Sequence, residues 1–225
     1  MILTAQGISK KYMRAVNSAN YFEAVSNSNL TLSGSTLSVL MGRSGSGKTT
    51  LLTMLAGLLS PSEGQVLMDG QDIYALGDRL LSKLRASRIS VIPQGASAIS
   101  SLTVMENICL PASLSGKPAP LQQAGALMER LGIAPLANAL PASLSGGELR
   151  RMAVVRALCA RPDFLFADEP TADLDDENSR IVLGLLKDAA RAGAAVLIVS
   201  HESDAAGYAD ALYRMNGGKL VKEEP

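Results

Sequence analysis

Residues 42–49 read Gly42-Arg43-Ser44-Gly45-Ser46-Gly47-Lys48-Thr49, and this stretch decides the fold. An apolar run over 36–41 precedes it and is typical of a buried strand, while residues 49–59 have helical character. The glycines allow successive backbone N–H groups to turn toward one point, and the N-terminus of the following helix adds positive partial charge there. A strand, a glycine-rich loop and a helix in this order match the P-loop pattern, which binds the phosphates of a nucleoside triphosphate.

The side chains of this loop have separate expected roles. Lys48 is expected to reach the β- and γ-phosphates, and the Thr49 hydroxyl is expected to ligate Mg²⁺. The alternative is a Gly/Ser loop with a solvated lysine, and the flanking strand and helix argue against it. The residues expected to contact the nucleotide here are Gly42, Ser44, Gly45, Ser46, Gly47, Lys48, Thr49 and Thr50.

A second pattern consists of four apolar residues followed by two acids, Phe164-Leu165-Phe166-Ala167-Asp168-Glu169. An apolar strand that ends in Asp places the carboxylate at the carboxyl edge of the sheet, where ligands bind in open α/β folds. Asp168 is therefore a candidate Mg²⁺ ligand, and Glu169 is a candidate general base for an attacking water. Alone, the two acids could simply end a strand and begin a loop. The phosphate loop upstream favours the catalytic interpretation.

Strand and helix patterns alternate along the chain, which predicts an α/β fold with a mostly parallel sheet covered on both faces. Asp175 is the expected N-cap of one helix. Residues 95–160 are rich in Ala, Leu, Met and Ser, and we expect them to form several short helices as an inserted helical lobe. Strands are expected over 2–9, 28–33, 64–73, 90–93, 164–167, 194–200, 210–215 and 219–221, and helices over 78–88 and 176–191.

The composition fits one globular domain over residues 1–225 and argues against several classes of protein. Lys+Arg and Asp+Glu each number 21, so no basic excess indicates a nucleic-acid partner. We recognise no signal peptide, and no apolar run approaches the roughly 18 residues that span a bilayer. Cys109 and Cys159 are too few for a disulfide framework or a zinc site, so we expect them to be buried apolar residues. These features predict a cytosolic protein.

Leu144-Ser145-Gly146-Gly147-Glu148 resembles the signature of the ATP-binding-cassette (ABC) ATPases, and it lies between the phosphate loop and the two acids, as in that family. The same residues form a capping-box pattern, Ser145 with Glu148, for a helix expected over 149–160. The family more often has Gln at the position of Glu148. The resemblance implies a P-loop NTPase core with an antiparallel β subdomain, and an ATPase that uses ATP and Mg²⁺. It also implies that Ser145, Gly146 and Gly147 face the γ-phosphate bound by a second subunit.

Further positions are similar to functional positions of the family. Gln94 resembles the glutamine that touches Mg²⁺ or the attacking water, and His201 resembles the histidine that contacts the γ-phosphate. Asp173-Leu174-Asp175 resembles the loop that crosses the dimer interface, where Asp175 is expected at the shared nucleotide site. Ala is usual at position 173, so Asp173 departs from the family pattern. The residues expected to be catalytic are Glu169, His201, Gln94 and Lys48, and the expected Mg²⁺ ligands are Thr49, Gln94 and Asp168.

Tyr12 resembles the aromatic residue that stacks on adenine in this family. Tyr21 and Phe22 are alternatives for that role, and ordinary packing is the other interpretation of Tyr12.

The resemblance extends over essentially the whole chain and implies ATP-driven transport through a separate integral membrane permease. A second nucleotide-binding subunit is expected, in a homodimer, on the cytoplasmic face of the membrane. The sequence looks most like ATPases of the lipoprotein-release and macrolide-export type, and the permease is expected to contact the lobe near residues 95–115. The alternatives are an importer ATPase, or a soluble ABC ATPase that acts on nucleic acid or ribosomes. The absence of a long heptad segment and of a basic surplus argues against the soluble class.

Overall fold

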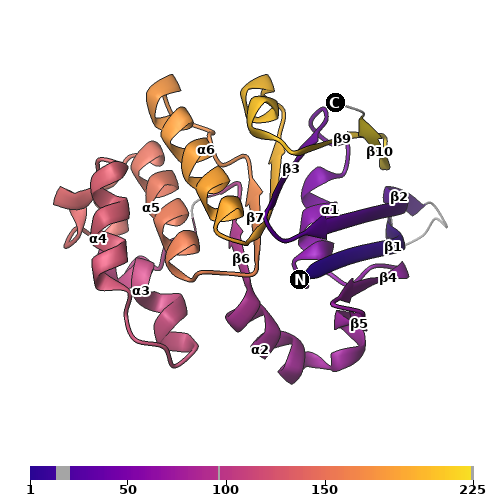
Figure 1. The fold of residues 1–225 in the computed structure, drawn as a ribbon, viewed down its shortest axis with the longest axis horizontal. Coiled ribbons are helices and arrows are strands. Elements are labelled where there is room, and N and C mark those ends of the chain that lie inside the picture. The colour runs from indigo at the N-terminus through magenta and orange to yellow at the C-terminus, as the bar shows by residue number, and fades with distance from the viewer. Residues whose placement is uncertain (14–20, 96, 224–225) are drawn as a thin grey trace.

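A six-stranded, mostly parallel sheet forms the centre of the protein (Figure 1). The computed structural model describes residues 1–13, 21–95 and 97–223. The strand order is β10-β9-β3-β8-β7-β6, in which only the β9–β10 pair is antiparallel. The strands are β3 (Thr36–Met41), β6 (Ile89–Ile92), β7 (Phe164–Asp168), β8 (Ala195–Ser200), β9 (Ala211–Asn216) and β10 (Lys219–Glu223). The predicted α/β class and parallel sheet are confirmed.

A second sheet is antiparallel, with the order β2-β1-β4-β5, and it is the predicted β subdomain. Its strands are β1 (Ile2–Met13), β2 (Tyr21–Ser33), β4 (Glu63–Met68) and β5 (Gln71–Asp72). The expected strands 2–9 and 28–33 were too short, because the outer part of this ladder is largely exposed and shows no regular alternation of apolar and polar residues. The register also shifts between Ala5 and Ile8, around Gly7 with its φ of 60°.

The helices cover the parallel sheet and extend it at one end. α3, α4 and the start of α5 project from the β6 and β7 side as the predicted helical lobe (Figure 1). The expected helix over 49–59 ends earlier, at Leu55, where Ala56 caps it and Gly57 turns away with a φ of 69°. The helices are α1 (Lys48–Leu55), α2 (Asp78–Arg88), α3 (Val104–Leu114), α4 (Leu121–Arg130), α5 (Gly146–Cys159) and α6 (Asp176–Arg191). Short 3-10 helices cover Ile73–Leu76, Ala134–Leu136, Pro141–Ser143 and Ser203–Tyr208.

The central strands are buried on both faces, which explains why they read as continuous apolar runs. Along β8, Val196 and Ile198 join the core beneath α5 and α6, while Leu197 and Val199 join the core beneath α1 and the antiparallel sheet. Because packing fixes both faces, the carboxyl ends of these strands are rigid supports for the side chains that follow them.

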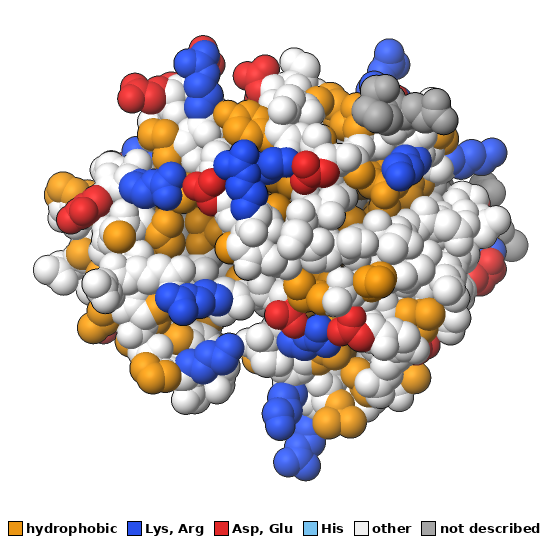
Figure 2. Space-filling view, viewed as in Figure 1, with side chains coloured by type: hydrophobic (Ala, Val, Ile, Leu, Met, Phe, Trp, Pro, Cys, Tyr) orange, Lys and Arg blue, Asp and Glu red, His pale blue; other side chains and the backbone are white. Residues whose placement is uncertain are grey.

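The surface has no dominant charge on the face shown in Figure 2, where basic and acidic side chains are interspersed. Within the described part of the chain, no helix is long and apolar enough to cross a membrane.

Asp210 ties α6 to the parallel sheet. Its Oδ2 accepts a hydrogen bond from the Leu37 amide at 2.8 Å, and its Oδ1 accepts one from Lys187 Nζ at 2.6 Å. These two contacts, that of Lys187 first, hold the pKa of Asp210 below its usual range.

Asp210→Asn is expected to lower the free energy of unfolding by about 0.5–1 kcal/mol at pH 7, a small effect because the carboxylate is 43% exposed and solvent screens it. Since the folded pKa is depressed, the stabilisation is complete above the unfolded pKa of about 3.9 and is lost as pH falls through the folded pKa. Urea unfolding of both proteins at pH 7 and near pH 3 measures this. The difference between them should shrink at the lower pH, and an unchanged difference would contradict the assignment.

Candidate functional site

A cleft of about 780 Å³ lies at the carboxyl ends of the parallel strands. It gathers residues from distant parts of the sequence, most of which the motifs had predicted. Its lining consists of Tyr12, Phe22, Ala24, Met41, residues 42–50, Gln94, Asp168, Glu169, His201 and Arg214. Four predicted site residues lie outside it, namely Ser145, Gly146, Gly147 and Asp175.

The glycines of the loop are required by its tight fit against neighbouring strands. A Cβ on Gly47 would lie 2.0 Å from the carbonyl oxygen of Ala24, and the φ of Gly47 is 104°. A Cβ on Gly42 would lie 2.4 Å from the carbonyl oxygen of Met215. The backbone therefore approaches β2 and β9 too closely for any other residue at these two positions.

The loop presents polar groups that suit a phosphate ligand. Lys48 is buried, and its Nζ donates to the carbonyl oxygens of Gly42 at 2.7 Å and Arg43 at 3.1 Å. The Ser46 hydroxyl is buried and has no hydrogen-bond partner among the residues that the structure describes. Burying a hydroxyl without a hydrogen-bond partner costs folding free energy. The unpartnered Ser46 hydroxyl just before α1 therefore fits a site that receives ligand oxygens.

Thr49 and Asp168 bring two oxygen ligands together from α1 and β7. The Thr49 hydroxyl donates to Asp168 Oδ2 at 2.7 Å. Burial raises the pKa of Asp168, and the hydrogen bond from Thr49 opposes that rise. These hard oxygen donors fit Mg²⁺, which typically takes one or two protein ligands and completes its shell with phosphate and water oxygens. No group of three acidic, His or Cys residues that could hold a metal occurs in the described ranges.

Glu169 follows β7 in a conformation that is unusual for a residue with a side chain. Its φ is 49°, and its amide donates to the carbonyl oxygen of Val199 at 2.9 Å, which anchors it beside β8. The buried carboxylate lies 2.8 Å from His201 Nδ1 through Oε1, and the Ser200 hydroxyl is 3.4 Å from Oε2. The hydrogen bond and the charge of Glu169 raise the pKa of His201, whose side chain is 61% exposed. A carboxylate fixed in this way can accept a proton at the edge of the cleft.

The backbone that carries Gln94 is held by the helix that follows the signature motif. Arg150 of α5 is buried and donates through Nη1 to the carbonyl oxygen of Pro93 at 2.5 Å, and through Nη2 to that of Gln94. Burial lowers the pKa of Arg150. Sequence reasoning missed this residue, because an arginine on a helix ordinarily reads as solvated.

The signature residues form a separate surface at the N-terminus of α5. Ser145 and Glu148 make the predicted capping box, with Glu148 Oε2 accepting from the Ser145 amide at 2.7 Å. The helix therefore begins at Gly146, three residues before the expected 149. A Cβ on Gly147 would lie 3.0 Å from the carbonyl oxygen of Asp173, so this surface packs on the loop before α6. Asp175 caps α6 by accepting from the Asn178 amide at 2.8 Å, as predicted.

Two aromatic side chains lie on the β1–β2 ladder at the other end of the cleft. Tyr12 and Phe22 are register partners, and both line the cleft, whereas Tyr21 pairs with Met13 and does not line it. Lys10 Nζ lies 5.8 Å from the centre of the Tyr12 ring. The arrangement keeps Tyr12 and Phe22 as the candidates for stacking on a base.

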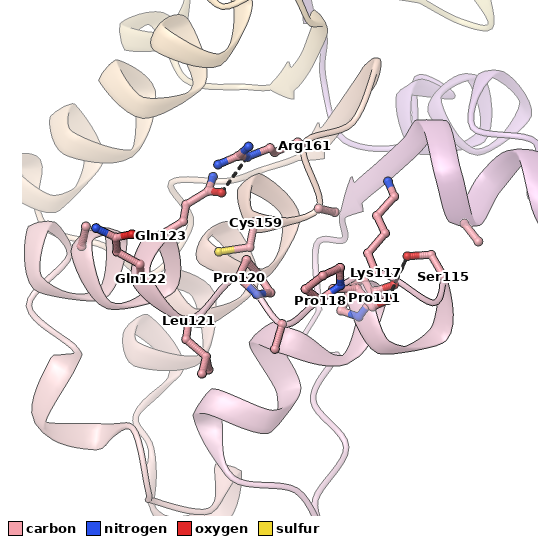
Figure 3. A pocket seen from close by; sticks show the side chains of 15 residues that line it. Pro111, Ser115, Lys117, Pro118, Pro120, Leu121, Gln122, Gln123, Cys159 and Arg161 are labelled. Carbon is pink, nitrogen blue, oxygen red and sulfur yellow. Dashed lines mark hydrogen bonds between the residues drawn. The ribbon is translucent and has the colours of Figure 1, made fainter.

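A second hollow, of about 580 Å³, lies among the ends of α3, α4 and α5 and contains none of the predicted site residues (Figure 3). At one edge Arg161 Nε donates to Gln123 Oε1 at 2.8 Å. Cys159 lies in its wall, and burial raises the pKa of its thiol to about 12, so the thiol stays protonated at neutral pH. Cys109 and Cys159 are both buried and free, as expected.

Comparisons with known proteins agree with this geometry. The family model described as "ABC transporter" matches residues 25–172. "Methionine import ATP-binding protein MetN" of Rhizobium johnstonii is 42% identical over 188 residues, which are 82% of this chain and 52% of that protein. "Lipoprotein-releasing system ATP-binding protein LolD" of Pseudomonas syringae pv. tomato is 37% identical over 186 residues, which are 81% of this chain and 82% of that protein. The chain spans about half the length of the methionine-import relatives that it matches.

The fold matches a solved structure along almost its entire length. The dimeric post-hydrolysis state of the ATP-binding cassette MJ0796, bound to ADP and Pi, superposes with a TM-score of 0.91 and 29% identity. The match covers 99% of this chain and 98% of that chain.

Proposed function

Because the chain belongs to the ABC transporter family, we propose that it binds and hydrolyses ATP with Mg²⁺ and thereby powers transport across a membrane through a separate permease. The observation that carries the proposal is the cleft itself, where the phosphate loop, Asp168, Glu169, His201 and Gln94 converge at the ends of parallel strands. Each of these groups matches a need of phosphoryl transfer, which is mainly positioning and charge neutralisation.

Each residue of the cleft has its own role in the proposed hydrolysis of ATP. Lys48 and the loop amides hold the phosphates, and Thr49 and Asp168, with Gln94, hold Mg²⁺, which neutralises phosphate charge when bound. Glu169 accepts the proton of the attacking water. His201, aligned by its contact with Glu169, faces the γ-phosphate.

A second copy of the chain completes the site. Ser145, Gly146 and Gly147 lie on a surface outside the cleft of their own subunit, although a helix N-terminus with exposed glycines suits a phosphate. In a head-to-tail dimer this surface covers the cleft of the other subunit. The dimeric MJ0796 cassette supports a dimer of this chain, and we place Asp175 close to its interface.

The relatives suggest two types of transport. We propose an export function of the lipoprotein or peptide type, at the cytoplasmic face of the membrane, because the lipoprotein-releasing relative is matched over 82% of its length. Methionine import is the second candidate, since that relative is 42% identical. An ABC ATPase that acts on nucleic acid or ribosomes is the third, and the balanced charge argues against it.

The test is purification of the chain with Mg²⁺ and ATP from detergent-solubilised membranes of its source cell, followed by reconstitution of whatever copurifies into lipid vesicles. We expect a polytopic membrane protein in fixed proportion to the chain, and ATP-dependent release of a lipid-modified peptide from the vesicles. ATP-dependent uptake of methionine would establish the importer. Copurification of ribosomes or DNA without a membrane protein would overturn the transport proposal and keep the ATPase.

A further inference from the structure

We propose that Arg214 is a nucleoside-binding residue, whose guanidinium donates hydrogen bonds to acceptor atoms of the base or ribose. The inference rests on the proposed binding of ATP in the cleft and adds to it a residue that the motifs did not identify.

The sheet divides the cleft into two halves, with β3 and the phosphate loop between them. His201, Asp168 and Gln94 follow β8, β7 and β6, which all lie on one side of β3. Arg214 lies on β9, on the other side, where it is the register partner of Met41. Arg214 is therefore separated by the loop from the half that holds the reacting phosphate.

Arg214's half of the cleft is the one that carries the aromatic residues. The turn between β9 and β10 packs on β2, because the Ser26 amide donates to the Gly218 carbonyl at 2.8 Å. The Gly218 amide in turn donates to the Ser46 carbonyl at 3.0 Å, which joins this turn to the phosphate loop. Arg214 thus shares its half of the lining with Phe22 and Tyr12, the candidates for stacking on the base.

The side chain of Arg214 is aimed by its place in the strand. Its neighbours Tyr213 and Met215 are buried in the core beneath α1 and the antiparallel sheet, so alternation along β9 turns Arg214 away from that core, and its side chain lines the cleft at the end of the strand. Glu223, on the adjacent β10, accepts from Nε and also from Nη2 at 3.3 Å. This carboxylate fixes one edge of the guanidinium fork and leaves the Nη1 edge without a second acceptor within the described ranges.

The ion pair between Arg214 and Glu223 contributes little to the folding stability of the protein. The side chains of Arg214 and Glu223 are 54% and 29% exposed, and exposed ion pairs contribute little to folding. A planar donor held in one orientation at the wall of a nucleotide cleft is instead suited to hydrogen-bonding a ligand.

The experiment compares binding of ATP and of inorganic triphosphate by the wild type and by Arg214→Ala. We expect the Kd for ATP to rise about tenfold, as for loss of a charge-assisted hydrogen bond, and the Kd for triphosphate to stay unchanged. Arg214→Lys retains the charge and most of the aliphatic stem, and it should recover only part of the ATP affinity because it lacks the fork. Lys222→Ala removes an exposed cation of β10 outside the cleft and serves as the matched control.

The outcomes separate this inference from the proposed function. A wild type that does not bind ATP would refute the proposed function. A wild type that binds ATP, with Arg214→Ala binding it equally well, would overturn only the role of Arg214. An equal loss of affinity for ATP and triphosphate would also overturn it, because the effect would then belong to the phosphates or to the fold.

Discussion

Glu169→Gln is expected to slow phosphate release at saturating ATP by about 10²- to 10⁴-fold, the usual contribution of a general base. The amide of Gln keeps the size of the side chain, and its one oxygen still accepts one of the two hydrogen bonds that the carboxylate makes, but the amide accepts no proton from water. The positive φ of Glu169 and its amide bond to Val199 belong to the backbone, so the substitution should leave the site assembled.

ATP binding should survive this change, because Lys48 and the loop amides are untouched. The variant is therefore expected to accumulate as an ATP-bound dimer, which size-exclusion chromatography with and without ATP would reveal. Glu202→Gln is the matched control, since Glu202 is a glutamate adjacent to His201 that contacts Thr171 and does not line the cleft. Wild-type turnover by Glu169→Gln would remove Glu169 as the base.

Ser145→Arg is expected to abolish hydrolysis while the isolated subunit still binds ATP. Ser145 lies outside the cleft of its own subunit, so an arginine there should affect only the surface that covers the partner's nucleotide. The substitution also removes the N-cap of α5, which costs about 1 kcal/mol, so thermal unfolding is measured alongside. Ser143→Arg places the same charge two residues earlier, on an exposed position, and serves as its control. Loss of ATP binding in proportion to activity would contradict a site shared between subunits.

The two inactive variants provide a sharper test when they are mixed before ATP is added. A mixed dimer pairs the intact Glu169 of one subunit with the intact Ser145 of the other, which restores one of its two sites. Random pairing makes about half of the dimers mixed, so phosphate release should recover to about a quarter of the wild-type rate. Rates that merely add would argue that each subunit hydrolyses ATP alone.

The features that the sequence predicted well depend on local signals. The helix over 176–191 has its predicted bounds because Asp175 caps it, and the helix over 78–88 begins directly after Gly77. The strands β3 and β7 are likewise recognisable because burial on both faces leaves them mostly apolar, with Ser38 the polar residue inside β3. Since each motif follows such a strand or begins a helix, the motif residues that line the cleft could be predicted from sequence alone.

The features that were missed depend on contacts between distant segments. The exposed outer part of the β1–β2 ladder carries Tyr12 and Phe22 to the cleft, but only cross-strand pairing shows that both residues reach it. Arg214 had one local signal, a charged residue between two core positions of a strand, and its meaning depends on the neighbouring β10. Arg150 had none, because its partners are backbone carbonyls more than fifty residues away.

The grip of Arg150 on Pro93 and Gln94 has a consequence for recombination between cassettes. Arg156 of the same helix donates to Ser97, so one buried and one partly buried guanidinium group bind Pro93, Gln94 and Ser97 to α5. A chimera that exchanges helical lobes should therefore be spliced after Ile92, so that Pro93, Gln94 and Ser97 come from the same cassette as the arginines that bind them. A splice placed after Ser97 would pair both arginines with backbone carbonyls of the other cassette. It would also shift Gln94, which connects the grafted lobe to the nucleotide cleft.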